Sequence, residues 1–266
     1  MKLRKILSLI LIPSLLASAL FSCARTPESL TEKADKALSN KAHVIEVGVD
    51  YTVDNEAISA IFDQLERREV KLLVDGDKTA IEDRMSISYS GGETEFVNSY
   101  VVIGGIIYMD MKYTSAEGSN STRGKSEVGY EDAVSFKEKA SVIGGISYED
   151  FLSSEVTKRD GDREILSTGA GEELKVRLEN IIISALSGAA EKVKVKDARL
   201  TVELDGKKYE TVTLVCDYDI TMSGYTYTVT AEYELEYDYD EHVDITAPAN
   251  PSDYPDMELE TILRTL

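Results

Sequence analysis

The chain has 266 residues, of which 42% are hydrophobic, and it carries 29 Lys and Arg against 49 Asp and Glu, a formal net charge of −20 at pH 7. This length and hydrophobic content predict a folded chain with a sizeable core and argue against a disordered one. The acidic excess argues against a nucleic-acid partner, because the long-range electrostatic field of the protein repels phosphates.

The first residues have the composition of an export signal. Three basic residues precede an apolar stretch over residues 6–21, which is short for a bilayer span. The stretch ends in Leu20-Phe21-Ser22-Cys23, which resembles the lipobox of bacterial lipoproteins. The resemblance implies a signal peptide over residues 1–22, diacylglycerol on the Cys23 thiol, and a protein anchored to the cell membrane on its extracytoplasmic side. The alternative is an ordinary signal peptide with an incidental cysteine.

Helix and strand patterns follow in turn along the first half of the chain. Pro27, at a first helical position, predicts a short tether and an N-terminal helix within residues 23–41. Residues 43–53 alternate between apolar and polar side chains, as a half-buried strand does, and residues 55–66 have the apolar spacing of a helix. Further strands, separated by Gly pairs or Asp-Gly, are predicted at 69–75, 79–90, 94–103 and 106–113.

The middle of the chain is less regular. Residues 114–127 are small and polar and predict a long flexible loop. Residues 130–153 are predicted to be helical in part, and residues 171–190 form the strongest predicted helix, with seven apolar residues on one stripe. Seven of ten positions agree between 101–110 and 141–150, which leaves open a true repeat, chance, or shared turn chemistry.

Three long strands near the end are the clearest feature. In residues 225–240 every odd position is apolar or aromatic and every even position is Thr, Glu or Asp. This alternation predicts an antiparallel meander with one apolar and one polar face. Because strands of this length usually curl, the predicted fold class is α+β, with a long antiparallel sheet curled into an incomplete (half) β-barrel and helices over its concave face. We expect a single domain over residues 42–254 and a C-terminal tail over 255–266.

The sequence offers no constellation that predicts catalysis, so the chain is not expected to be an enzyme or to hold a metal or cofactor. His43 and His242 stand beside strands and are expected at the surface, whereas Cys216 is expected to be a small buried hydrophobe. Acidic residues alternate along the last strand and are expected to form a solvated face, with a weak divalent-ion surface as the alternative: Glu232, Glu234, Glu236, Asp238 and Asp240.

These features together resemble the superfamily of lipoprotein carriers that includes LolA, LolB and LppX. The resemblance lies in the lipobox, in the pattern of a half-barrel closed by helices, and in a long last strand followed by V-x-I-x-x-P (Val243 to Pro248) and Tyr254. It implies a membrane-anchored lipoprotein that binds or carries a hydrophobic ligand between sheet and helices. Residues on the apolar side of the last strands would line that cavity: Leu214, Tyr218, Ile220, Tyr225, Tyr227, Val229, Tyr233, Leu235 and Tyr237.

A second function remains open from the sequence. If the helices simply cover the apolar face as core, no ligand cavity exists. The chain would then be a lipid-anchored, β-rich protein-interaction module whose acidic face docks a protein partner.

Overall fold

The computed structural model describes residues 26–65, 68–89, 92–129, 155–186 and 190–263. Three features expected from the sequence lie outside these ranges: the anchor Cys23, the partly helical stretch 130–153, and the second copy of the similarity at 141–150.

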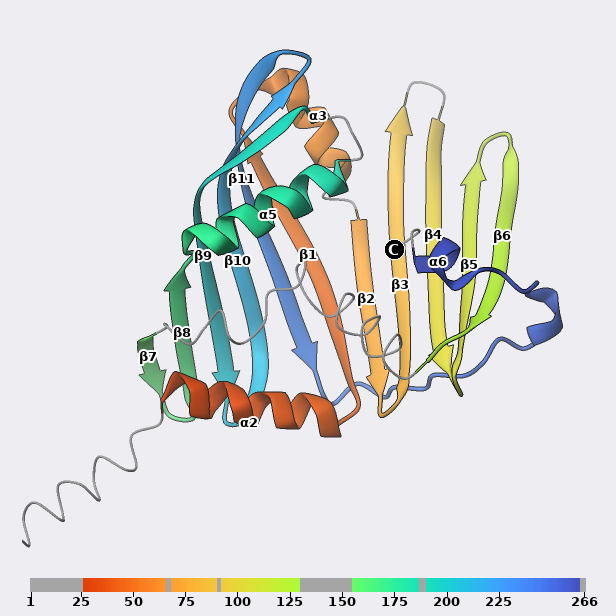
Figure 1. The fold of residues 1–266 in the computed structure, drawn as a ribbon, viewed down its shortest axis with the longest axis horizontal. Coiled ribbons are helices and arrows are strands. Elements are labelled where there is room, and N and C mark those ends of the chain that lie inside the picture. Colours follow the sequence, from red (N-terminus) through yellow and green to blue (C-terminus); the bar gives the residue numbers. More distant parts are fainter. Residues whose placement is uncertain (1–25, 66–67, 90–91, 130–154, 187–189, 264–266) are drawn as a thin grey trace, which may run out of the picture.

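Within the described residues, eleven strands form one antiparallel sheet in the order β6-β5-β4-β3-β2-β1-β11-β10-β9-β8-β7 (Figure 1). The first strand lies in the middle of the sheet. The next five strands step outward on one side, and the last five step inward from the opposite edge. The strand bounds are β1 (His43–Val53), β2 (Arg68–Asp75), β3 (Lys78–Tyr89), β4 (Gly92–Ile103), β5 (Ile106–Ser115), β6 (Gly118–Glu127), β7 (Glu155–Asp160), β8 (Arg163–Gly169), β9 (Lys192–Asp205), β10 (Lys208–Met222) and β11 (Tyr225–Asp238).

The two halves of the sheet are joined by the pairing of β1 with β11. This pairing covers ten residues of each strand, from Val44 opposite Asp238 to Val53 opposite Val229. In contrast, β1 pairs with β2 over only five residues and ends this pairing at Val47. Beyond Val47, β1 leans away from β2 and follows β11, which Figure 1 shows as a fork near the middle of the sheet.

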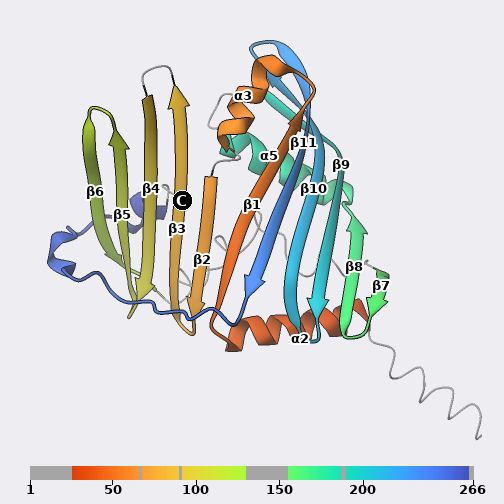
Figure 2. The ribbon, with the colours of Figure 1, turned by 180° about the vertical axis from the view of Figure 1, so that it is seen from behind.

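The helices lie on one face of this sheet, because each carries one apolar stripe that must be buried. They are α2 (Pro27–Asn40), α3 (Glu56–Leu65), α5 (Glu172–Ala185) and α6 (Leu259–Leu263), and a short 3-10 helix spans Pro251–Asp253. Figures 1 and 2, drawn from opposite sides, show α5 and α6 in front of the sheet in the first view and behind it in the second.

The apolar face carries two hydrophobic clusters. The first packs α2, α3 and α5 against β8 to β11. The second packs the strands β1 to β5 against the C-terminal segment, with Ile262 fully buried. Val212 and Tyr237 pack against both clusters and so mark the boundary between them. Residues 255–263 are therefore part of the packed domain, although the sequence suggested a tail.

The predicted antiparallel sheet with unlike faces is confirmed, but the predicted curl into a half-barrel is wrong. The structure is mainly β, and its sheet is neither closed nor strongly curled. The reason lies in the strand order. The meander β2 to β6 continues outward from β1, so the edge strands β6 and β7 lie at opposite ends of the sheet and do not approach each other.

The predicted flexible loop at 114–127 is also wrong, because these residues form most of a hairpin. β6 pairs with β5 over ten residues, from Ile106 opposite Glu127 to Ser115 opposite Gly118. The small polar residues fit an edge strand, whose backbone is satisfied on one side by its neighbour and whose outer side faces solvent. The outer side of β6 is partly covered: Lys125 accepts a backbone hydrogen bond from Met257 N–H at 2.8 Å.

The two histidines differ in environment. His242 is exposed, as expected, whereas the expectation that His43 lies at the surface is wrong: its side chain is buried. In the register of β1, His43 shares the apolar face with Ile45, and its ring lies 5.7 Å from that of Tyr239. Cys216 is a free, buried cysteine, which confirms its expected place.

The assignment of faces can be tested on β10. Leu214 is fully buried in the first cluster, whereas the next residue, Val215, lies on the opposite face and is partly exposed. We expect Leu214→Ala to lower the free energy of unfolding by about 2–5 kcal/mol, because it removes apolar contacts and leaves a cavity. Val215→Ala should cost about 1 kcal/mol or less. Urea denaturation of both variants measures the difference, and equal losses would contradict the assignment.

Candidate functional site

The sequence-predicted ligand-lining residues divide into three groups. Five are fully buried members of the two clusters: Leu214, Tyr218, Ile220, Val229 and Leu235. Tyr227, Tyr233 and Tyr237 are half-buried, and Tyr225 is 69% exposed at the start of β11. The structure thus places the first group in the core, whereas the half-buried tyrosines and Tyr225 keep exposed surface that a ligand can touch without displacing the core.

The half-buried tyrosines continue into a stripe along β1. Val47, Val49, Tyr51 and Val53 point to the apolar face, and each is only partly buried. Val49 lies opposite Tyr233 in the ladder. We call these four residues together with Tyr227, Tyr233 and Tyr237 the central stripe. It runs along the two middle strands, between strands whose apolar side chains are mostly fully buried.

Aromatic contacts organise one end of the central stripe. The Tyr51 ring lies 5.0 Å from that of Phe62 on α3 and 6.2 Å, edge to face, from that of Tyr233. The two tyrosine hydroxyls are 3.5 Å apart. Burial raises the pKa of Tyr233 well above its ordinary value, and burial likewise raises the pKa of Tyr237. These hydroxyls therefore stay protonated and remain hydrogen-bond donors at any physiological pH.

The opposite, open face of the sheet is polar, and the described helices do not cover it. One row of side chains can be followed across it through the strand register. From β10 to β6 it reads Thr211, Glu236, Glu46, Lys71, Glu82, Ser99, Asp110 and Arg123. The alternation seen in the sequence of β11 therefore separates an apolar face from a charged one, as predicted.

Like charges face each other where β1 meets β11. Glu46 lies opposite Glu236 and Asp50 opposite Glu232, while Glu234 lies opposite Gly48. Burial, and then the neighbouring carboxylates of Glu236, Glu232 and Asp50, raise the pKa of Glu234 above its ordinary value. Glu232, Glu236, Asp238 and Asp240 are exposed, as expected for a solvated face. Within the described residues, no group of three or more His, Cys, Asp or Glu is placed to hold a metal ion.

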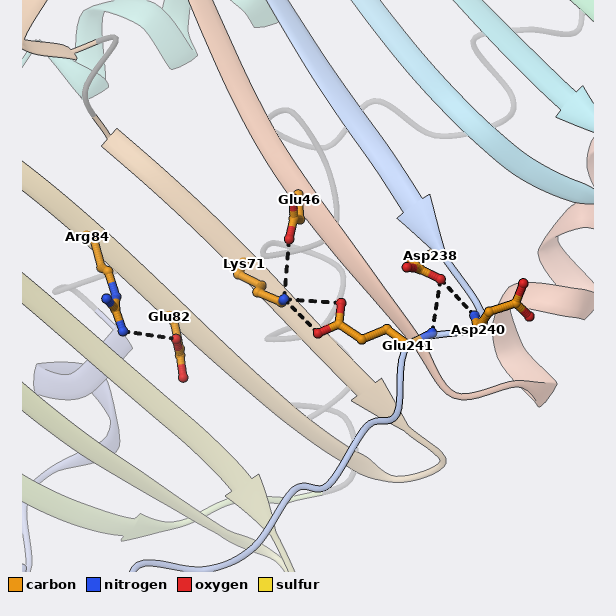
Figure 3. Close-up of polar contacts among 7 residues, drawn as sticks. All are labelled: Glu46, Lys71, Glu82, Arg84, Asp238, Asp240 and Glu241. Carbon is orange, nitrogen blue, oxygen red and sulfur yellow. Dashed lines mark hydrogen bonds and ion pairs between the residues drawn. The ribbon is translucent and has the colours of Figure 1, made fainter.

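Lys71 connects this acidic ladder to the C-terminal segment (Figure 3). Its Nζ lies 2.9 Å from Glu241 Oε1 and 3.3 Å from Glu46 Oε1. The hydrogen bond to Glu241 is the main cause of a raised pKa for Lys71. Asp238 accepts backbone hydrogen bonds from Asp240 at 2.7 Å and Glu241 at 3.0 Å, so the chain turns sharply where β11 ends.

Two grooves adjoin this corner. One, of about 420 Å³, lies at the fork of β1 and β2 and is lined by Glu46, Val47, Gly48, Arg68, Glu69, Val70, Lys71, Glu234 and Glu236. The other, of about 520 Å³, lies where β10 begins and β11 ends. We call it the terminal groove, and its lining residues are Glu46, Asp205, Lys208, Tyr209, Glu210, Thr211, Glu236, Tyr237, Asp238, Tyr239, Asp240 and Glu241.

Sequence reasoning missed Lys71, Lys208 and Tyr209. No local pattern marks Lys71, because its partner Glu241 is 170 residues away along the chain. Tyr209 carries a weak signal: it is an aromatic residue just after the turn at Asp205-Gly206, on the apolar side of a strand. Its hydroxyl donates to Asp35 of α2 at 2.7 Å, which links the helix to the start of β10.

Comparison with known proteins gives no relatives: no protein-family model matches the chain, and no curated protein matches it at a significant level. No helix in the described ranges is long and apolar enough to cross a membrane.

The facing carboxylates of β1 and β11, which we call the like-charge ladder (Glu46, Asp50, Glu232, Glu234 and Glu236), predict that the stability of the protein depends on pH. Because the pKa of Glu234 is raised by folding, the stability it contributes is present below its ordinary pKa of 4.5 and is lost as the pH rises through the raised value. Glutamine does not ionise, so Glu234→Gln should be more stable than the wild type at pH 7, by up to about 1 kcal/mol. The two proteins should unfold alike well below pH 4.5.

Thermal unfolding at both pH values measures this difference. The control is Glu93→Gln, which removes an exposed carboxylate that lies opposite Ser88 on β3. If Glu93→Gln stabilised the protein as much as Glu234→Gln does, the effect would come from the net charge of the chain and not from the ladder.

Proposed function

We propose that this chain is a membrane-anchored, extracytoplasmic lipoprotein that binds or carries a hydrophobic ligand, a lipid or an acylated molecule, between its sheet and its helices. The proposed role is binding and not catalysis. Cys23 would hold the protein at the membrane, and the central stripe would contact the ligand.

The observation that carries this proposal is the partial burial of the central stripe. On β10, next to β11, and on β9 beyond it, the apolar side chains are mostly fully buried, as in a complete hydrophobic core. In contrast, Val47, Val49, Tyr51 and Val53 on β1 each keep part of their surface exposed. An incompletely covered apolar surface in the middle of a sheet favours binding of an apolar molecule.

Tyrosines suit such a surface. Their rings offer apolar contact area, and their protonated hydroxyls can bond to the polar end of a lipid. Tyr233 and Tyr237 lie in line on the helix-covered face of β11, and Tyr237 lies at the boundary of the two clusters. We therefore place the apolar chain of the ligand along β1 and its polar end near these hydroxyls.

A second function is supported by a different observation. Five of the nine residues expected to line a cavity are fully buried, and the open acidic face is left uncovered by the described helices. A lipid-anchored interaction module with a packed interior, which docks a basic partner on that face, fits these facts. The ligand experiment below separates the two functions.

The anchor is tested at Cys23. We expect Cys23→Ala to abolish incorporation of labelled palmitate and to leave the uncut precursor, because the thiol is the atom that receives the lipid. Metabolic labelling followed by gel electrophoresis measures both effects. Labelling that persists in the variant would show that the lipobox interpretation is wrong.

The ligand site is tested at Val49, since a charge at a fully buried position such as Val229 would unfold the domain with or without a ligand. Val49→Glu places a carboxylate in the partly exposed central stripe and should weaken binding of a fluorescent fatty acid by about tenfold or more. Thr52→Glu is the matched control, because it adds the same charge to the open face of the same strand. Its fatty-acid affinity should remain within about twofold of the wild type.

Native mass spectrometry of the full-length wild type should also reveal a co-purified lipid, and Val49→Glu should carry less of it. A well-folded wild type that neither carries lipid nor binds the fatty acid would contradict the carrier function. The interaction module would then be the better description.

A further inference from the structure

We propose that the outer edge of β6 pairs with β6 of a second copy of this chain, so that two molecules form one continuous sheet across a two-fold axis. The contact is made by residues 118–122. The proposal does not depend on the hydrophobic ligand, because β6 is an edge strand and the central stripe lies on the two middle strands.

The contact with the C-terminal segment shows which backbone groups of β6 face outward. Lys125 N–H donates to Pro255 O at 2.9 Å, and Lys125 C=O accepts from Met257 N–H at 2.8 Å, so both groups of Lys125 point away from β5. The register of β6 with β5 has no shift. Because backbone groups alternate between the two sides of a strand, the N–H and C=O of Ser119 and Ser121 also point outward.

Among the described residues, no strand pairs with the outer side of residues 118–122. The C-terminal segment makes a bridge to β6 between Lys125 and Asp256, and Figures 1 and 2 show it beside the part of β6 that lies farther from the turn with β5. Residues 118–122 are exposed, and the outward N–H of Ser121 donates to its own neighbour, Asn120 Oδ1, at 2.8 Å. This edge is therefore open to a further strand.

The two edges of the sheet differ in their protection. Natural edge strands avoid pairing by short length, charges, proline or bulges. β7 has six residues, four of them charged, and its register with β8 shifts between Val156 and Lys158. In contrast, residues 118–122 (Gly-Ser-Asn-Ser-Thr) carry no charge, no proline and no shift in register. Of these two edges, that of β6 is suited to pair with another strand.

The composition of this edge favours a second copy over an unrelated peptide. Peptides that add to a sheet edge are selected by pockets for their alternate side chains, and the short side chains of 118–122 give little basis for such selection. Antiparallel pairing centred on Asn120 places Ser119 opposite Ser121 twice, and each of these pairs can exchange two backbone hydrogen bonds. The contact uses β6 of both copies and leaves the protected β7 edges outside, so association stops at a dimer.

Charge favours this register locally and opposes association at long range. In the pairing centred on Asn120, the exposed Glu117 of each copy lies opposite Arg123 of the other, so opposite charges meet. Each chain carries a formal net charge of −20, however, and the two copies repel each other as they approach. Because salt screens this repulsion, with a Debye length of about 10 Å at 0.1 M, the dimer should become tighter as salt is added.

The first test changes the outward backbone donor. Sedimentation velocity of the full-length protein should show a monomer–dimer equilibrium that strengthens between about 0.01 and 0.1 M salt. Ser121→Pro removes an N–H that does not bond to β5, and it should raise the dimer dissociation constant about tenfold or more. Ser121→Ala is the matched control: it removes the hydroxyl but keeps the N–H, and its dissociation constant should stay within about twofold of the wild type.

The second test uses the two-fold axis itself. Because Asn120 lies opposite its own copy, Asn120→Lys and Asn120→Glu each place like charges against each other and should weaken the dimer by about threefold or more. An equimolar mixture of the two variants should associate more tightly than either alone, since lysine then faces glutamate.

The proposal is overturned if the wild type is monomeric at every concentration, if Ser121→Pro dimerises as tightly as Ser121→Ala, or if the mixture of Asn120 variants associates no better than each variant alone. Fatty-acid binding should be the same in Ser121→Pro and the wild type, which keeps this result separate from the carrier function.

Discussion

The pairing of β1 with β11 is the contact that the rest of the structure depends on. Without it the chain would be two separate meanders, each with an unpaired inner edge and an apolar face only partly covered. The pairing also fixes the register of the whole sheet, because a shift of one residue would move every side chain of β1 to the other face. Val49 would then leave the central stripe, and Glu46 would enter it.

This pairing divides the molecule into two chemically distinct sides. Apolar side chains, tyrosines and helices gather on one face, and the other face carries acidic, basic and small polar groups. Where β1 and β11 meet, Glu46 lies opposite Glu236 and Asp50 opposite Glu232, although like charges directly opposite each other destabilise a sheet. The pairing that joins the two halves of the sheet thus carries like-charge pairs on its open face, and the central stripe lies on the other face of the same two strands.

The local alternation in the sequence was enough to predict β1 to β5 and β9 to β11, and the antiparallel meander of β9 to β11 with its two unlike faces, because period-two patterning is a property of neighbouring residues. It was not enough to predict the overall curvature, which depends on whether distant edges such as β6 and β7 approach each other. The pattern also gave a wrong prediction where the side chains do not alternate between apolar and polar. The polar residues 118–127 were expected to form a loop, but they form a strand because their backbone pairs with β5. His43 was misplaced because its burial depends on Tyr239, almost two hundred residues later.

The candidate site, like the fold, was only partly predictable from the sequence. The tyrosines of β11 were found from the sequence because they repeat every second residue. Sequence periodicity does not tell a core residue such as Leu214 from a partly exposed one such as Tyr237, because both keep the same alternation. The terminal groove was not predicted, since it requires a bulge at Glu210, the end of β11 and a turn at Asp238 to come together.

The central position of the first strand also has a consequence for how the protein folds. Residues paired between β1 and β11 are separated by 176 to 194 positions along the chain. Contacts of such high sequence separation slow folding, because the entropy of closing the intervening loop is lost before the contact contributes stability. We expect the local hairpins of β2 to β6 and of β9 to β11 to form first, and the two halves to join last.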